Sequence, residues 1–286
     1  MSFIADGGSL FEGFRGVTNS PYSRPQIYDI AFRFRDFSLA VDFLTEASAQ
    51  AGMKEITSVV ELGCGPAQYV REFASRGIKT YGIDLSPEMV SYATDLCTKD
   101  NLPCRIIEDD MRSFELPQQV DLAVCMIATI HLLLTNEDIV THLRCVADNL
   151  KPHGLYIIEM THPRDIFPSE KGVQDKWELE GDGIKVETDW GTDAVMDLIT
   201  EIKTGTVKYA VTHGLKTERF EFREKWRAIP FGLIRALIEL SGRFELAATY
   251  GDLDVNKPFD SDKDSWRMML VLRKIACEPA GSKTSG

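Results

Sequence analysis

Hydrophobic and polar positions alternate along the first part of the chain in a repeated strand and helix rhythm. Apolar runs of strand length occur at 58–62, 79–85, 104–110, 120–130 and 150–160. Apolar residues recur every three or four positions, as on one face of a helix, over 36–52, 69–77, 86–96 and 139–150. Strands that alternate with helices form a parallel sheet covered on both faces, so this part predicts an α/β fold.

The rhythm changes after Met160. Residues 177–229 carry the alternation typical of antiparallel strands, with turns expected at Gly181-Asp182-Gly183 and Lys203-Thr204-Gly205. A helix over 231–240 and strands over 243–254 and 265–274 follow. We therefore expect N-terminal cap helices over 1–52, a core of 53–164 plus 230–276, an inserted β-rich lid over 165–229 and a flexible tail over 277–286.

Composition and charge limit the classes of partner that the protein can bind. The 286 residues carry a formal net charge of -12, without the basic stripe that a nucleic acid requires. No apolar stretch reaches the length of a membrane span, and residues 1–16 lack the basic start and apolar core of a secretory signal. We expect a cytoplasmic protein with no nucleic-acid or membrane partner, acting on small molecules, cationic ones included.

The six cysteines form no CxxC pair and mostly lie inside apolar runs: Cys64, Cys97, Cys104, Cys125, Cys145 and Cys277. They are expected to be small buried hydrophobic residues in a reducing compartment, with no metal site. Cys97 and Cys104 could approach one another across a turn between a helix and a strand.

The turn after the first strand is the most informative segment. In "VVELGCGPAQYV", Gly63 and Gly65 indicate a tight turn that a ligand approaches closely. A dinucleotide fingerprint would place a third glycine where this chain has Gln68, and the Gly-Lys-Ser/Thr of a phosphate-binding loop is absent. Because ligands of parallel sheets bind at the carboxyl ends of the strands, this turn should share one edge with Asp84, Asp110, Met126 and Thr161.

This turn, followed by "YGIDLSPEMV", "EDDM", "DLAVCM" and "LKPHGLYIIE", resembles in order and spacing the motifs of the class I S-adenosylmethionine-dependent methyltransferases. The resemblance spans 28–160, with a weaker match in the last two strands. It implies S-adenosylmethionine as cofactor and a Rossmann-like α/β fold, with a mostly parallel seven-stranded sheet, helices on both faces and an inserted antiparallel β lid.

The resemblance also implies cofactor contacts. Glu61 would meet the ammonium group of the methionine end, and Asp84 would accept both ribose hydroxyl groups. Asp110 would accept the adenine amino group. The remaining expected contacts are Gly63, Gly65 and Pro66 along the methionine part, Leu85, Met89 and Met111 on the adenine, and Met126 at the same edge. A lysine-bearing loop is not needed, because S-adenosylmethionine has no phosphate.

Two further segments, "IYDIAFRFRDF" and "CMIATIHLL", resemble small-molecule N-methyltransferases, sugar N,N-dimethyltransferases most and glycine N-methyltransferase more distantly. By this resemblance Tyr28 is both a cofactor and a catalytic residue, because its ring and phenol oxygen would lie near the sulfonium. The alternative is a core tyrosine on an amphipathic helix. Arg33 would bind the cofactor carboxylate, or else is solvated.

His131 is the expected general base, because it follows the fourth strand and an ordinary histidine pKa suits proton transfer at neutral pH. The sugar enzymes place their histidine one residue later, where this chain has Leu132, so His131 could instead point into a helix interface. His162, Trp190 and Trp226 are expected to line the acceptor site, with a core position as the alternative for the tryptophans. His142 is expected on a helix surface.

These features predict methyl transfer from S-adenosylmethionine to a small-molecule acceptor, with an amine nitrogen expected, by in-line displacement under the lid. The alternatives are a small-molecule O- or C-methyltransferase and a non-catalytic module that binds S-adenosylmethionine. The sequence leaves a homodimer open.

Overall fold

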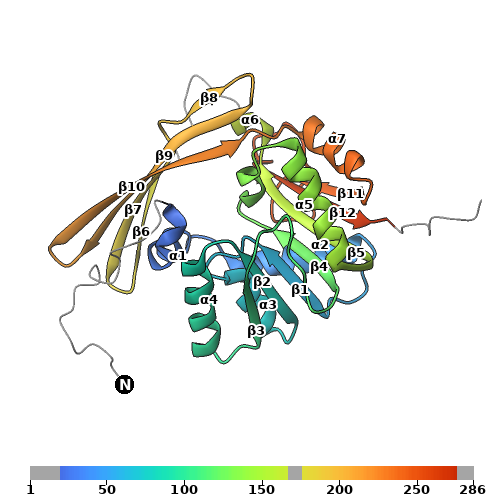
Figure 1. Cartoon of the computed structure of the whole chain (residues 1–286), viewed down its shortest axis with the longest axis horizontal. Helices are drawn as coiled ribbons and strands as arrows, with labels where there is room; N and C mark the ends of the chain where they lie inside the picture. The colour runs from blue at the N-terminus through green and yellow to red at the C-terminus, as the bar shows by residue number, and fades with distance from the viewer. Residues whose placement is uncertain (1–19, 167–175, 276–286) are drawn as a thin grey trace, which may run out of the picture.

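The computed structural model describes residues 20–166 and 176–275, which form two sheets (Figure 1). The larger sheet has seven strands in the order β11-β12-β5-β4-β1-β2-β3. Its strands are β1 (Ser58–Leu62), β2 (Lys79–Asp84), β3 (Cys104–Glu108), β4 (Val120–Cys125), β5 (Leu150–Thr161), β11 (Phe244–Tyr250) and β12 (Arg267–Lys274). Strands β1 to β5 are parallel, and β12 runs antiparallel to both of its neighbours. The predicted mostly parallel seven-stranded sheet is confirmed.

Helices cover both faces of this sheet. Its helices are α2 (Phe37–Gln50), α3 (Gln68–Ser75), α4 (Pro87–Lys99), α5 (Asn136–Asn149) and α7 (Phe231–Ser241). Strand β5 illustrates the two faces, because Leu155 and Ile157 pack in one cluster with residues of α2 and α3. Tyr156 and Ile158 pack in the other cluster, with residues of α5 and α7. Successive side chains of the strand point to opposite faces of the sheet, and both faces are buried. This explains why the strand is a continuous apolar run.

The second sheet is antiparallel and comes from the chain between β5 and α7. Its strands are β6 (Lys176–Gly181), β7 (Ile184–Trp190), β8 (Val195–Asp197), β9 (Ile202–His213) and β10 (Lys216–Arg227). Their order is β10-β9-β7-β6, with β8 paired to β9. Helix α1 (Pro25–Ala31) lies beside this sheet (Figure 1), and its Ile27 and Ile30 pack against Val186 and Val207. The separate antiparallel sheet is thus confirmed.

Short helices complete the described residues: the 3-10 helices η2 (Pro21–Ser23) and η3 (Thr129–Leu132), and α6 (Pro163–Ile166). Within 20–166 and 176–275, no helix is long and apolar enough to cross a membrane. The domain boundaries remain predictions. The flexible tail over 277–286, Cys277, core residue 276 and the part of the cap before residue 20 lie outside the described residues.

Two local predictions were wrong. The turn expected at Lys203-Thr204-Gly205 lies inside β9, because Gly205 is needed for close packing rather than for a turn. A Cβ added there would lie 2.8 Å from the Cβ of Ala194 and 3.2 Å from Cζ3 of Trp226. The fourth strand ends at Cys125, five residues before the expected Ile130. Ile127 and Ala128 take left-handed backbone angles there, which end the strand before η3 begins.

Candidate active site

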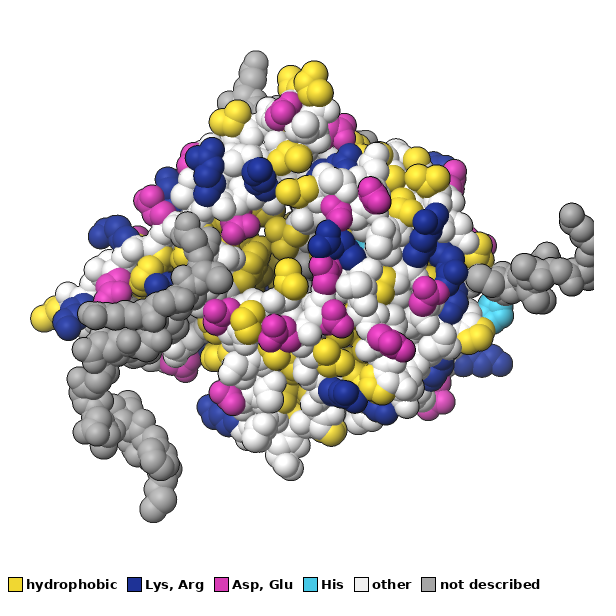
Figure 2. All heavy atoms as spheres, viewed as in Figure 1, with side chains coloured by type: hydrophobic (Ala, Val, Ile, Leu, Met, Phe, Trp, Pro, Cys, Tyr) yellow, Lys and Arg dark blue, Asp and Glu magenta, His cyan; other side chains and the backbone are white. Residues whose placement is uncertain are grey.

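A cavity of about 1180 Å³ lies between the carboxyl ends of the core strands and the second sheet. It is lined by residues that follow β1, β2, β3 and β4, by the N-terminal segment around Tyr22 and Tyr28, and by β7, β9 and β10. Figure 2 shows the opening as an apolar hollow with acidic side chains along its lower rim. This is the edge at which ligands of doubly wound sheets bind.

The glycine turn forms one wall of the cavity. Gly63 and Gly65 have φ values of 66° and 50°, in the left-handed region that favours glycine. A Cβ added at Gly63 would collide with Cγ2 of Thr129. Gly63 therefore lets the turn pack closely against Thr129, and both glycines line the cavity.

A smaller cavity of about 30 Å³ adjoins the turn and is lined by Glu61, Gly63, Gly65, Pro66, Met126 and Tyr28, among others. Glu61 is 5% exposed, and its Oε2 has no hydrogen-bond partner in the described residues. Burial raises the pKa of this carboxyl group well above its usual value. Because a buried carboxylate without a partner is unfavourable, Glu61 fits a cationic ligand group such as the ammonium of S-adenosylmethionine.

Asp84 stands at the end of β2 and is tied to the glycine turn. Its Oδ2 accepts the Gly65 N–H at 2.7 Å, and its Oδ1 accepts the Ser86 N–H at 2.9 Å. Burial raises the pKa of Asp84, against the effect of three backbone donors, the N–H groups of Ser86, Gly65 and Leu85. Ser86 caps α4 through the Met89 N–H, so Asp84 is not needed as the cap. A carboxylate has about four lone-pair sites, more than these three donors use, so Asp84 can still accept from a ribose hydroxyl group.

Met89 is fully buried beneath the turn, and Leu85 lines the cavity with 68% of its surface exposed. Asp110 and Met111 also line the cavity. The Asp110 carboxylate holds Arg112 through Nε and Nη2, and the hydrogen bond from Arg112 lowers the pKa of Asp110. Because Oδ1 also accepts the Arg112 backbone N–H at 2.9 Å, the oxygen left for an adenine amino group is Oδ2.

His142 supports this wall from below. Its Nδ1–H donates to the Met111 carbonyl at 2.8 Å, and its Nε2 accepts the Tyr156 hydroxyl at 2.6 Å. The side chain is fully buried, and burial lowers its pKa to about 4. The prediction of a surface position was wrong. His142 lies three residues after Ile139 and four before Val146, on the buried face of α5, and that spacing could have identified it.

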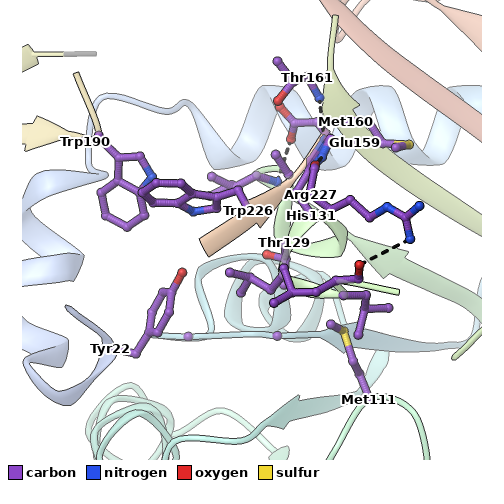
Figure 3. A pocket seen from close by; sticks show the side chains of 18 of the residues that line it. Tyr22, Met111, Thr129, His131, Glu159, Met160, Thr161, Trp190, Trp226 and Arg227 are labelled. Atoms are coloured by element: carbon purple, nitrogen blue, oxygen red, sulfur yellow. Dashed lines mark hydrogen bonds between the residues drawn. The ribbon is translucent and has the colours of Figure 1, made fainter. Parts of the chain in front are cut away.

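His131 lines the cavity but uses both ring nitrogens on backbone groups (Figure 3). Its Nδ1–H donates to the Arg227 carbonyl at 2.7 Å, and its Nε2 accepts the Thr161 N–H at 3.3 Å. Burial lowers its pKa to about 4, so the ring is neutral at pH 7. The imidazole thus connects β10 to the end of β5. A role as general base, which would require Nε2 to leave Thr161, stays a prediction.

The structure brings Tyr28 to the site but not Arg33 or His162. Tyr28 lines both cavities and stacks on Phe32 at 4.3 Å between ring centroids. Arg33 pairs with Asp29 and Asp182 and lines neither cavity. His162 also lies outside both, because its Nε2–H donates to the Asp260 carbonyl at 2.9 Å and its Nδ1 accepts from Arg164.

Trp190 and Trp226 line the side of the cavity formed by the second sheet, with ring centroids 6.3 Å apart. Figure 3 shows them next to each other, with Tyr22 pointing its hydroxyl group into the same space. Tyr22 was not identified from the sequence, where it lies in a Pro- and Ser-rich segment without periodicity.

A buried ion cluster, also missed, forms part of the cavity wall. Glu159 of β5 accepts from Arg35 at 2.8 Å and from Arg267 at 2.7 Å. Its Oε2 also accepts the Ile127 N–H at 3.0 Å, which holds the loop after β4. Burial opposes the charged form of Glu159, but the two arginines hold its pKa below the usual value. A glutamate inside a buried strand requires such partners, and this signal was present in "LYIIEM".

Comparisons with known proteins agree with this geometry. Residues 59–154 match the family model of a methyltransferase domain. The Bacillus subtilis protein YqeM, classed as a methyltransferase, is 24% identical over 214 residues, which are 73% of this chain and 82% of that protein. The dTDP-3-amino-3,4,6-trideoxy-alpha-D-glucopyranose N,N-dimethyltransferase of Streptomyces venezuelae is 26% identical over 139 residues, 46% of this chain and 55% of that enzyme. The chain thus spans about half the length of that sugar enzyme.

Solved structures share the fold. An S-adenosylmethionine-dependent methyltransferase from Clostridium acetobutylicum superposes with a TM-score of 0.73 at 18% identity, over 88% of this chain and 97% of that one. DesVI of Streptomyces venezuelae superposes with a TM-score of 0.69 at 19% identity, over 87% and 97%.

Proposed function

We propose that this chain is an S-adenosylmethionine-dependent methyltransferase that acts on an amine. It transfers the methyl group of S-adenosylmethionine to the amine nitrogen of a small molecule bound beneath the second sheet. The observation that carries the proposal is a single cavity that joins the glycine turn and Asp84 to Trp190 and Trp226. The similarity to sugar N,N-dimethyltransferases supports an amine as the acceptor.

The residues present fit the cofactor at each of its ends. Glu61 has an unpartnered buried oxygen for the ammonium, the glycine turn lies open to the methionine part, and Asp84 has lone pairs for the ribose. Leu85, Asp110 and Met111 would hold the adenine, while Pro66 and Met126 border the small cavity. Met89, which was expected on the adenine, is fully buried and lines neither cavity. S-adenosylmethionine supplies a methyl group carried on a sulfonium.

The chain's contribution to the reaction is alignment and exclusion of water. The amine lone pair forms a bond to the methyl carbon as the bond from carbon to sulfur breaks, with its electron pair left on sulfur. The nitrogen then carries an extra proton, which it releases to water. Tyr28 would offer an aromatic face to the sulfonium, and the second sheet would act as a lid that excludes water and aligns the acceptor.

Calorimetric titration with S-adenosylmethionine and S-adenosylhomocysteine tests the donor site. We expect micromolar binding of both and at least a tenfold loss in Asp84→Ala, because hydrogen bonds to a charged acceptor contribute about 1.5–3 kcal/mol. Asp95→Ala, an exposed carboxylate on the neighbouring α4, is the matched control and should bind normally. Unchanged affinity in Asp84→Ala would refute the ribose site.

Product analysis tests the acceptor atom. Incubation with S-adenosylmethionine labelled in the methyl carbon and a panel of amines, alcohols and phenols should place the label on nitrogen, as read by NMR of the products. A label on oxygen or carbon would refute the amine assignment while leaving the methyltransferase intact.

A further inference from the structure

The acceptor side of the cavity is an aromatic surface. Trp190 stands at its centre, with ring centroids 6.3 Å from Trp226, 6.5 Å from Trp177 and 5.3 Å from Phe32. Tyr28 lies 6.2 Å from Trp190 and joins this surface to the donor side. All five rings line the same cavity, so a flat apolar group entering it meets aromatic faces.

The position of Trp226 is fixed by two glycines of the second sheet. A Cβ at Gly191 would lie 3.0 Å from Cη2 of Trp226, and a Cβ at Gly205 would lie 3.2 Å from its Cζ3. The indole edge therefore packs directly against backbone. A ring packed in this way is preorganised, and a ligand that stacks on it loses little affinity to side-chain ordering.

The lining of the cavity as a whole carries a net negative charge. Within the described ranges, seven carboxylate residues and five cationic residues line it. The arginines among them are already paired: Arg35 and Arg267 with Glu159, Arg112 with Asp110 and Asp138, and Arg227 with Glu201. Lys203 donates to the Asp165 carbonyl at 3.3 Å.

A diphosphate would be poorly accommodated by this arrangement. It would bring two or more negative charges into a cavity whose lining is net negative. The arginine side chains that line the described part of the cavity already form ion pairs with carboxylates, so they are less available to bind phosphate. An amine, protonated in solution, is attracted by the same lining and can approach the aromatic faces as a cation. It reacts only after it has released that proton to water, which frees its lone pair.

We propose that the acceptor is an amine that carries a flat apolar group and no phosphate, with the flat group stacked against Trp226 and Trp190. The inference rests on the proposed function and specifies its substrate class. The proposed acceptor differs from the dTDP-linked sugars for which two of the relatives are named.

The test is a calorimetric titration of the S-adenosylhomocysteine-loaded protein with tryptamine, phenethylamine and 1-naphthylmethylamine, each compared with thymidine diphosphate. We expect at least one aromatic amine to bind ten times more tightly than thymidine diphosphate. Its Kd should rise at least tenfold in Trp226→Leu and recover in Trp226→Phe, which keeps an aromatic face. Trp190→Leu provides the same test should Trp226→Leu fail to bind S-adenosylhomocysteine.

Thymidine diphosphate binding as tightly as the best amine would overturn the inference, as would the absence of binding by all three amines. An aromatic amine whose affinity is unchanged in both tryptophan variants would overturn it too. Binding of S-adenosylhomocysteine is measured first and separately. Its failure would remove the proposed function, whereas failure of the amine titrations alone would remove only the acceptor class.

Discussion

Glu61 is an ionisable side chain at the fourth position of a strand that is buried throughout. Glu61 lines the small cavity beside the glycine turn, and its Oε2 has no hydrogen-bond partner among the described residues. A buried polar group without a partner lowers stability unless a ligand supplies the missing contact. Glu61 is therefore better explained by ligand binding than by folding.

We therefore expect Glu61→Gln to weaken S-adenosylmethionine binding about tenfold, because a charge-assisted hydrogen bond becomes a neutral one. Stability should change little, because the amide keeps an oxygen that can accept the Val70 N–H and has no charged form to bury. Calorimetry and urea unfolding measure the two effects. The control Glu55→Gln changes an exposed glutamate just before β1 and should alter neither. Normal affinity in Glu61→Gln would show that Glu61 does not meet the ammonium.

The buried histidines make stability depend on pH. Burial lowers the pKa of His142 to about 4, while the unfolded chain has an ordinary value near 6.5. The unfolded state then binds more protons between these values, so the contribution of His142 is complete above pH 6.5 and is lost as pH falls toward 4.

Replacing His142 by Asn should flatten the decline of unfolding free energy between pH 6.5 and 4 by up to about 3 kcal/mol. It should also lower stability at pH 7, because the Met111 carbonyl and the Tyr156 hydroxyl lose a partner. Urea titrations at a series of pH values measure both. His213→Asn, at an exposed position, should retain the wild-type decline. An equally steep decline in His142→Asn would contradict the assignment.

At the scale of elements, periodicity predicted the strands and helices of the core because each has one face or both faces buried. The ends of the strands were harder to predict from the sequence. The end of β4 depends on the left-handed angles of Ile127 and Ala128, which the Glu159 carboxylate supports through the Ile127 N–H. Such support comes from a distant strand and leaves no local pattern. The turn predicted at Gly205 was wrong for the same reason, because the role of this glycine depends on its contacts with Ala194 and Trp226.

Gly205→Ala should lower stability by about 1–3 kcal/mol, because the new Cβ has no room beside Ala194 and must shift that residue or Trp226. We expect kcat/KM for the acceptor to fall while S-adenosylhomocysteine affinity stays the same, since the donor side is not touched. Gly232→Ala in α7, where a Cβ meets nothing within 4 Å, is the control and should be neutral or slightly stabilising. Equal behaviour of the two variants would mean that Gly205 does not position Trp226.

At the scale of the whole molecule, Glu159 connects parts of the chain that are far apart in sequence. Arg35 follows α1, Glu159 lies in β5 and Arg267 begins β12, and the three side chains are 7%, 6% and 10% exposed. Arg35 also donates to Tyr69 of α3 at 3.0 Å. The segment that carries Tyr22 and Tyr28 to the cavity is thus held against the centre of the core sheet.

Glu159→Gln should cost about 3–5 kcal/mol of unfolding free energy, because two buried arginines lose the carboxylate that they share. The loss should exceed that of Glu245→Gln, which breaks the more exposed pair with Arg273 and should cost less than about 1 kcal/mol. If the cluster also holds Tyr28 in place, Glu159→Gln will weaken S-adenosylhomocysteine binding under conditions where the protein is still folded. Urea unfolding and calorimetry on the same preparations separate the two effects, and equal stability of the two variants would show that the cluster does not hold these segments together.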